Sequence, residues 1–295
     1  MKDGRLTALI CMTAIILCGS CHPAPLVTHA KPVTAILGAF EREVTLLEDQ
    51  LSDPQEKNIE GIGFATGKLK GQEVVVVWTG IGKVNAAMTT TLLIEHFKPK
   101  HIIFTGIAGA VNPELEPGDI VIAERTAHHD MGTVWPEGLF FRGVKSPLDG
   151  FENPVFFHAD EELVEVAQRA AQQINLGQIR LLTGERTPRI ITGVVVTGDA
   201  FIASTEKCKE LRKRLEADAV EMEGAAVAQI CYQRQISHIV IRSISDNADE
   251  GAVLDKQTFY IMAVRNSAAL VAEIVGLMAS DPTVEKNDGS DNLGN

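Results

Sequence analysis

The feature that most constrains the fold is an alternation of short apolar runs with stretches of helical periodicity. The segment Glu73–Trp78, which contains four consecutive valines, is typical of a strand buried on both faces. We expect strands at 33–37, 62–69, 73–78, 102–105, 119–123 and 190–197, a short one ending at 220, and a last one at 238–245. We expect helices at 41–50, in a segment ending near 96, at 160–174, at 206–215, directly after 221, and at 256–278. This alternation predicts an α/β fold with a largely parallel central sheet and one core.

The N-terminal segment has the pattern of an export signal. Lys2 and Arg5 precede an apolar run from Leu6 to Cys18, which is too short to span a bilayer comfortably. Two small residues then precede Cys21, an arrangement that resembles a bacterial lipoprotein signal in which Cys21 becomes the lipidated first residue. Ordinary cleavage after a small residue, or an uncleaved anchor, are the alternatives.

The sequence therefore divides into four expected parts. They are a signal peptide of lipoprotein type at 1–21, a linker at 22–32, a globular domain at 33–280 and a disordered polar tail at 281–295. We expect an exported protein, either periplasmic or lipid-anchored at the cell envelope, whose only membrane contact is the anchor at Cys21.

Charge and cysteine content narrow the class of partner. A formal net charge of −12 argues against nucleic acid, which needs clustered Lys and Arg, so we expect a small-molecule ligand. Only Cys208 and Cys231 lie outside the signal segment, and they are either buried thiols or one disulfide. No cluster has metal-ligand spacing, and His128–Asp130 is interpreted as a loop feature, so no metal or cofactor is expected. The segment 128–157 lacks periodicity and is predicted to be a long functional loop.

Short motifs follow the predicted strands, where α/β sheets place their ligands. They read GAFEREV, TGIGK, TGIAGA, TGDAFI, VEMEG and RSISDNAD. TGIGK departs from the phosphate-binding P-loop pattern, and a tight turn is the better interpretation. Glu43 and Asp246 could each be an ordinary helix-start or turn residue. Together, at the strand ends of one sheet, they form a candidate pair for acid–base chemistry.

In combination these motifs resemble the 5′-methylthioadenosine/S-adenosylhomocysteine nucleosidases of the nucleoside phosphorylase-like superfamily. The resemblance runs from Val33 to Met278, nearly the whole chain after the signal segment. It implies a single-domain three-layer α/β/α sandwich with a central mixed, largely parallel sheet, usually a homodimer, without a cofactor. It also implies a purine nucleosidase that hydrolyses the N-glycosidic bond of an adenosine derivative and releases adenine.

The resemblance assigns catalytic roles to the matching carboxylates. Glu43 matches the glutamate that orients and deprotonates the attacking water. Asp246 matches the aspartate that gives a proton to N7 of the purine, and Ser245 supports that aspartate.

Further positions match the substrate-binding motifs. Phe201 and Ile202 correspond to the residues that hold the base, while Met222 and Glu223 correspond to the ribose-binding pair. Expected binding residues elsewhere in these motifs are Phe40, Ile107, Gly109, Glu221 and Arg242. Ile107 departs from the family, which often has a small hydroxyl residue there.

Two alternatives to hydrolysis stay open. Phosphate-dependent phosphorylases of this superfamily hold phosphate with arginines, but HIIFTG at 101–106 has none and Glu43 would repel phosphate. A noncatalytic nucleoside-binding or storage protein on the same fold would need neither Glu43 nor Asp246. The preferred 5′ substituent is not fixed by these motifs.

Overall fold

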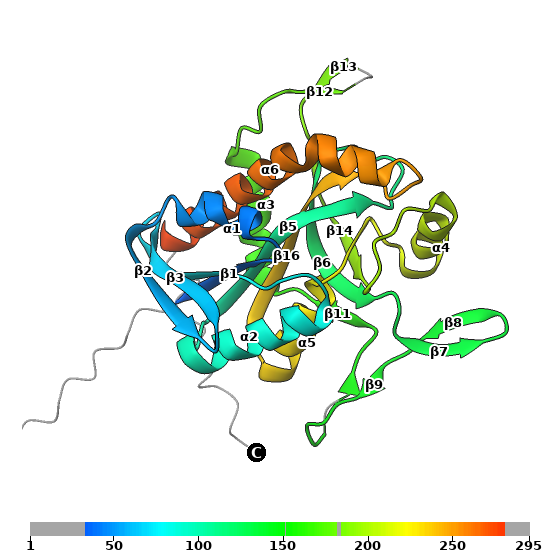
Figure 1. Ribbon diagram of the computed structural model, residues 1–295, viewed down its shortest axis with the longest axis horizontal. Coiled ribbons are helices and arrows are strands. Elements are labelled where there is room, and N and C mark those ends of the chain that lie inside the picture. Colours follow the sequence, from blue (N-terminus) through cyan, green and yellow to red (C-terminus); the bar gives the residue numbers. More distant parts are fainter. Residues whose placement is uncertain (1–32, 151, 182–183, 281–295) are drawn as a thin grey trace, which may run out of the picture. The chain divides into compact units, whose positions relative to one another are not determined.

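The computed structural model describes residues 33–150, 152–181 and 184–280. The signal segment, the linker and the C-terminal tail predicted from the sequence lie outside these residues. Ten strands of the described chain form one sheet (Figure 1). These strands are β1 (Thr34–Gly38), β2 (Ser52–Ile59), β3 (Ile62–Leu69), β4 (Gln72–Trp78), β5 (His101–Ala110), β6 (Ile120–His128), β11 (Phe156–His158), β14 (Ile190–Thr197), β15 (Ala219–Glu221) and β16 (Ser237–Asp246).

The sheet is mixed, with parallel pairs at its centre. Its order is β11-β6-β14-β15-β5-β1-β4-β3-β2, and β16 pairs with both β5 and β6. The pairs β1–β4, β1–β5, β16–β5, β14–β6 and β14–β15 are parallel. Antiparallel pairs lie in the β2–β3–β4 meander, at β11–β6, and where β15 meets β5 and β16 meets β6.

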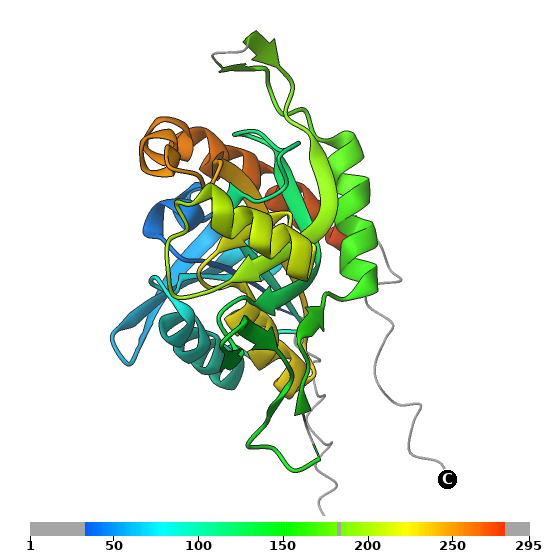
Figure 2. The ribbon, with the colours of Figure 1, turned by 90° about the vertical axis from the view of Figure 1, so that its right-hand side faces the viewer.

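Helices cover both faces of the sheet, which gives the three layers that the resemblance implied (Figures 1 and 2). The helices are α1 (Glu41–Glu48), α2 (Lys83–Phe97), α3 (Glu161–Gln173), α4 (Thr205–Leu215), α5 (Gly224–Arg234) and α6 (Ala252–Ser280). One apolar cluster joins α1, α3 and α6 to the sheet, and a second joins α2 and α5 to the other face. Helix α4 packs in a smaller cluster with β14 and β15.

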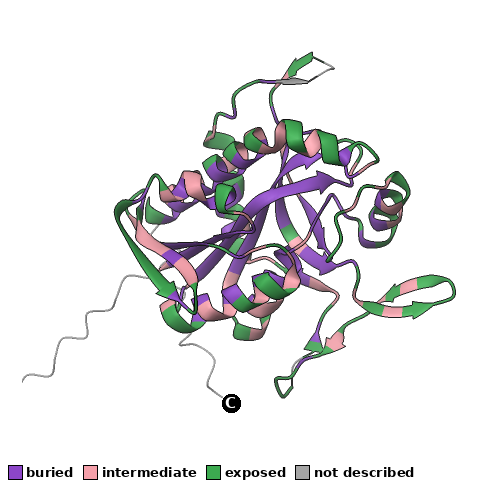
Figure 3. Cartoon of the chain, viewed as in Figure 1, coloured by how far each residue is buried: buried purple, intermediate pink, exposed green. Residues whose placement is uncertain are grey.

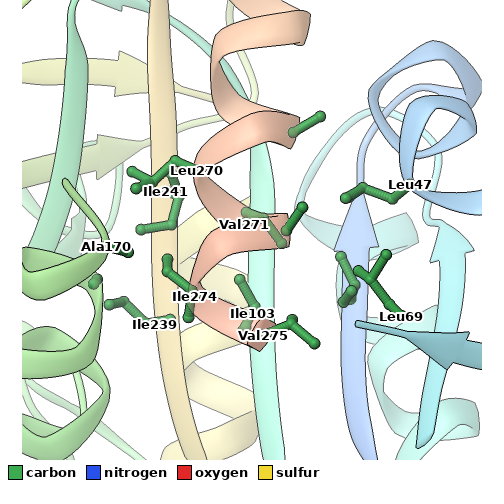
Figure 4. Packing of buried hydrophobic residues seen from close by; sticks show 14 of the residues in the cluster. Leu47, Leu69, Ile103, Ala170, Ile239, Ile241, Leu270, Val271, Ile274 and Val275 are labelled. Atoms are coloured by element: carbon green, nitrogen blue, oxygen red, sulfur yellow. The ribbon is translucent and has the colours of Figure 1, made fainter. Parts of the chain in front are cut away.

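The core lies along the central strands, which are buried throughout their length (Figure 3). Every residue of β5 is buried, and α6 packs Leu270, Val271 and Ile274 against β5 and β16 (Figure 4). Full burial of each such side chain stabilises the fold by about 1.5–3 kcal/mol. Helix α6 is long and apolar enough to cross a membrane, but its buried apolar face shows that it is a core helix of this domain.

Three features differ from the elements expected from sequence. Strand β5 continues to Ala110, so the motif TGIAGA lies within a strand rather than after one. Strand β2 was not predicted, because its sequence SDPQEKNI is polar and nearly all exposed at the edge of the sheet. Between 128 and 157, the predicted loop contains strands: it completes β6, forms the hairpins β7–β8 and β9–β10, and ends in β11.

The small hairpins stand apart from the main sheet (Figure 1). They are formed by β7 (Gly132–Trp135) with β8 (Gly138–Phe141), β9 (Val144–Lys145) with β10 (Glu152–Asn153), and β12 (Ile179–Leu181) with β13 (Gly184–Arg186). Cys208 and Cys231 are both buried free thiols, so they do not form the disulfide that the sequence left open.

Candidate active site

Glu43 is a buried carboxylate held by three backbone amides. It lies in the first turn of α1, directly after β1, and only 2% of the residue is exposed. Its Oε2 accepts hydrogen bonds from the N–H groups of Ala39 (2.7 Å) and Phe40 (2.9 Å), and its Oε1 accepts one from Ile107 (3.0 Å). The turn after β1 and the middle of β5 together fix the carboxylate in one orientation.

The surroundings of Glu43 favour its neutral form more than water would. Burial raises the pKa of Glu43 above 4.5, while the positive charge of Arg242 and the three amides oppose this rise. A carboxylate with a raised pKa is a stronger base once it has ionised. Gly106 lets β5 pass this close, because a Cβ there would lie 2.7 Å from Oε1 of Glu43.

Asp246 is the last residue of β16 and is 2% exposed. Its Oδ2 accepts a hydrogen bond from the Ser245 hydroxyl (2.7 Å), and its Oδ1 accepts one from the Ala248 N–H (2.9 Å). Burial raises the pKa of Asp246 above 3.8, although both hydrogen bonds and the charge of Lys256 favour the ionised form. The structure thus pairs Ser245 with Asp246, as the sequence comparison of motifs predicted.

Strand β5 joins the two carboxyl groups. The N–H of Ile107 binds Glu43, and Gly109 pairs in register with Asp246 on β16. A Cβ at Gly109 would lie 2.7 Å from Oδ1 of Asp246, so only glycine admits this approach. Both carboxyl groups therefore contact the same central strand, Glu43 through the main chain of Ile107 and Asp246 beside Gly109.

Glu221 and Arg242 form a buried ion pair beside Glu43. The Arg242 Nη2 lies 2.6 Å from Oε2 of Glu221, and the two side chains are 1% and 3% exposed. Glu221 also accepts hydrogen bonds from the N–H groups of Glu223 and Gly224 and from the Thr197 hydroxyl. The Arg242 guanidinium stacks 4.1 Å from the Phe104 ring centroid. Glu221 is therefore fully committed to protein donors.

Glu223 stands between β15 and α5 and reaches across to the TGIGK turn. Its Oε1 accepts a hydrogen bond from the N–H of Gly82 (2.8 Å), a glycine with φ of 93°. Burial, together with the nearby carboxylate of Glu221, raises the pKa of Glu223 to about 8. The Gly82 amide and Arg242 act in the opposite direction. TGIGK is thus a tight turn that approaches another part of the site, as the sequence interpretation favoured.

The base-binding segment after β14 is held by a network that sequence analysis missed. Lys83 Nζ lies 2.7 Å from Asp130 Oδ1 and 3.7 Å from Asp199 Oδ2. Asp199 in turn accepts a hydrogen bond from the Lys83 N–H (2.8 Å), and its own N–H donates to Asp130 (3.0 Å). We call Lys83, Asp130 and Asp199 the clamp. It ties the start of α2 to the segments that follow β6 and β14. The only sequence signal for it was that Lys83 and Asp199 lie in motifs that follow predicted strands.

A cavity of about 550 Å³ opens beside this segment. Phe201, which is 42% exposed, forms one wall, and α6 supplies Lys256 and Tyr260. The Tyr260 ring meets Phe40 edge-on, with centroids 6.1 Å apart. Phe40 and Phe201 thus lie on either side of Lys256, whose Nζ is 5.1 Å and 5.2 Å from their respective ring centroids.

The remaining predicted residues lie in the same region. Ile202 and Met222 are partly exposed and flank Phe201 and Glu223 in sequence. Ile107 contributes its main-chain N–H to Glu43, while its side chain packs with α6.

Comparisons with known proteins place this arrangement in a family. The sequence profile of the phosphorylase superfamily matches residues 33–276. A 5′-methylthioadenosine/S-adenosylhomocysteine nucleosidase of Geobacillus kaustophilus is 38% identical over 83% of this chain and 97% of its own. The crystal structure of the corresponding nucleosidase of Neisseria meningitidis, in complex with methylthio-immucillin-A, has a TM-score of 0.72, is 35% identical, and covers 83% of this chain and 99% of its own.

A further solved structure is the futalosine hydrolase of Helicobacter pylori. It has a TM-score of 0.70, is 30% identical, and covers 83% of this chain and 97% of its own. Its name indicates a different substrate on the same fold, so the fold alone leaves the 5′ substituent undecided. The extent and identity of these matches show that the chain belongs to the phosphorylase superfamily and, within it, to the 5′-methylthioadenosine/S-adenosylhomocysteine nucleosidase family.

Proposed function

We propose that the protein hydrolyses the N-glycosidic bond of 5′-methylthioadenosine, S-adenosylhomocysteine or a related adenosine derivative and releases adenine. The observation that carries the proposal is the pair of buried carboxyl groups, Glu43 and Asp246, anchored two residues apart along β5. Both have a raised pKa. Breaking this bond needs a base for water on one side of the sugar and an acid at the purine on the other.

Glu43 acts as the general base. Its three amide contacts hold the carboxylate still, so a water molecule bonded to it is oriented before it attacks the anomeric carbon. The raised pKa strengthens its affinity for the water proton. The buried charge of Arg242 opposes this rise and favours the ionised carboxylate.

Asp246 acts as the general acid at the leaving purine. Negative charge develops on the base as the glycosidic bond breaks, and a proton delivered to N7 neutralises it. Burial favours the protonated carboxyl that this step requires. The Ser245 hydroxyl and the Ala248 amide keep the group pointed in one direction.

Glu223 and Met222 hold the ribose. The Glu223 carboxylate has one contact to Gly82 in the ligand-free protein and accepts hydrogen bonds from the ribose hydroxyls when substrate binds. The ribose hydroxyls favour the ionised form of Glu223, in which each charge-assisted bond contributes about 1.5–3 kcal/mol. Phe201 stacks on the base, Ile202 binds its edge through the main chain, and the Glu221–Arg242 pair holds the Glu223 turn in place.

Water is favoured over phosphate as the nucleophile by the charges around Glu43. The cation that acts on it, Arg242, is already paired with Glu221 and donates to the carbonyl oxygens of Phe104 and Ile241. A phosphate at the same place would therefore meet a buried carboxylate whose cationic neighbour, Arg242, is already engaged.

The test is product analysis of methylthioadenosine incubated with the purified protein, with and without phosphate. We expect adenine and a free reducing sugar in both conditions. Adenine formed only with phosphate, together with a sugar 1-phosphate, would assign a phosphorylase. Tight binding of the nucleoside without turnover would assign a noncatalytic binding protein.

We further propose that the protein is exported and carries a lipid anchor at Cys21. The support is the sequence alone: two basic residues, an apolar run and a cysteine preceded by small residues. Metabolic labelling with a fatty-acid analogue, compared between the natural protein and Cys21→Ala, tests this. Equal labelling of both would contradict it.

We also propose a homodimer. Its support is the exposed apolar surface of the TGIGK turn and α2, where Ile81, Val84 and Met88 are 49%, 78% and 51% exposed. Exposed apolar patches of this kind mark association surfaces. Analytical ultracentrifugation of the protein and of Val84→Asp checks the mass, and a monomer at all concentrations for the unsubstituted protein would contradict the proposal.

A further inference from the structure

The cavity beside Phe201 has an unusual balance of charge. Arg42 of α1 and Lys256 of α6 both line it, and no aspartate or glutamate does. Among the described residues, neither cation forms a salt bridge with a carboxylate. The protein as a whole has a net charge of −12, so the positive charge of this cavity contrasts with the rest of the molecule.

Lys256 is held in place by aromatic rings instead of by an acid. Its ammonium group lies between the faces of Phe40 and Phe201, about equally far from both ring centroids. Such contacts position a cation while leaving its charge unneutralised. Lys256 also lowers the pKa of Asp246, so its charge reaches the catalytic edge of the site. Asp255, its neighbour in sequence, acts on Asp246 in the opposite direction.

The position of the cavity fits the route of a 5′ substituent. Phe201 would stack on the base, and Tyr260, which also lines the cavity, packs edge-on against Phe40, whose N–H donates to Glu43. The cavity therefore opens between the base-stacking wall and the catalytic base. A group attached to C5′ of the ribose leaves the reacting atoms in this space and meets Lys256 and Arg42.

We propose that Lys256 and Arg42 select adenosine derivatives whose 5′ substituent ends in a carboxylate. This inference rests on the nucleosidase function proposed above and names its substrate class. An anionic tail replaces bulk water around the two cations and gains a Coulombic attraction that a neutral tail of equal size does not. The apolar residues Val253 and Ile261 in the same cavity contact the alkyl part of the tail.

The experiment compares two synthetic substrates that differ only in charge. One is 5′-deoxyadenosine with a 3-carboxypropylthio group at C5′, and the other is its primary amide. For the full-length protein we expect kcat/KM for the carboxylate to exceed that for the amide by roughly two- to fivefold, the range of a partly exposed ion pair. The ratio falls toward one in 0.5 M salt, because ions screen charges over roughly 3–10 Å in this range.

Variants assign the effect to the two cations. Lys256→Met combined with Arg42→Met brings the carboxylate-to-amide ratio close to one, and Lys256→Arg retains a ratio above one. Lys213→Met removes the same charge from an exposed position on α4 and leaves the ratio as it is. We compare the ratio of kcat/KM for the carboxylate to kcat/KM for the amide, because Lys256 also acts on Asp246 and its replacement can change the rates with both substrates equally.

Methylthioadenosine separates the two proposals. If it is hydrolysed while the unsubstituted protein treats carboxylate and amide alike, the tail selection is overturned and the nucleosidase stands. A ratio that persists in the double variant overturns the assignment to these residues. If neither methylthioadenosine nor the tailed substrates yield adenine, the proposed function fails, and the inference fails with it.

Discussion

At the scale of single residues, Glu43, Glu223 and Asp246 share surroundings in which burial is the largest influence on pKa. Each is nevertheless contacted by amides or a hydroxyl that stabilise its ionised form. The balance leaves all three groups easier to protonate than in water. Such carboxyl groups hold a proton at higher pH than an exposed aspartate or glutamate does.

Replacing Asp246 with asparagine tests the acid role. The amide keeps the shape but cannot deliver a proton, so we expect kcat/KM for adenine release to fall by about 10²–10⁴-fold. In the unsubstituted protein, activity should fall at high pH, where Asp246 loses the proton that it donates. It should also fall at low pH, where Glu43 gains a proton, and this loss begins at a higher pH than for an ordinary glutamate because the pKa of Glu43 is raised. Rate measurements over pH should show the alkaline limb lost in the variant, and a loss of less than tenfold would remove Asp246 from the mechanism.

Arg242→Met tests the buried ion pair. The substitution leaves Glu221 buried without its cation and removes the stacking on Phe104. We expect the free energy of unfolding to fall by about 3–5 kcal/mol, measured by urea denaturation. The double variant with Glu221→Met should recover part of that loss, because no uncompensated charge remains. A double variant less stable than Arg242→Met would contradict this account.

At the scale of elements, the site depends on how segments far apart in sequence are tied together. The clamp joins α2, β6 and β14, and the Gly82–Glu223 hydrogen bond joins α2 to α5. The same turn therefore supports the ribose side and the base side of the pocket. Neither side has to be rigid by itself.

Lys83→Met opens the clamp. Because its ion pairs are partly exposed, we expect global stability to change by less than about 1 kcal/mol. The segment 198–203 should nevertheless exchange its amide hydrogens faster. KM should rise about three- to tenfold, which corresponds to about 0.7–1.4 kcal/mol of binding free energy, and kcat should change less. Lys83→Arg is the matched control and should behave like the natural residue. Unchanged exchange in that segment would show that the clamp does not order it.

Much of this arrangement was predictable from sequence, and the exceptions have physical reasons. The four valines within β4 predicted that strand to within one residue of the bounds in the structure, because a strand buried on both faces needs continuous apolar residues. The polar edge strand Ser52–Ile59 has no such requirement and was missed. The clamp and the position of Lys256 depend on contacts across more than 40 residues of chain, which no local pattern records.

At the scale of the whole molecule, opposing groups set the dependence of stability on pH. His101 and His238 are buried with pKa values lowered to about 4, so below 6.5 the unfolded chain binds more protons and stability falls as pH falls. Glu223 has a pKa raised to about 8, so between 4.5 and 8 the folded protein binds more protons and stability falls as pH rises. Above pH 6.5 these two histidines are neutral in both the folded and the unfolded chain, so the change in stability there reports Glu223 and not the histidines.

Glu223→Gln provides the measurement. Between pH 6.5 and 8 the natural protein should lose unfolding free energy relative to the variant, by at most about 1.4 kcal/mol per pH unit. Urea denaturation of both proteins at several pH values in this window gives the difference. If the unfolding free energies of the two proteins change with pH in parallel, Glu223 is already ionised at pH 6.5.

The anchoring of both carboxyl groups to β5 has a consequence for how the protein can change. Both groups are fixed by contacts with a buried central strand and with the turns beside it, so exchanges in distant surface loops leave these contacts in place. The mouth of the site, built from Arg42 and Lys256 on helix surfaces, is free to diversify. Chemistry and substrate choice are thus separable traits, and new substrate preferences can be engineered at the mouth without rebuilding the reaction centre.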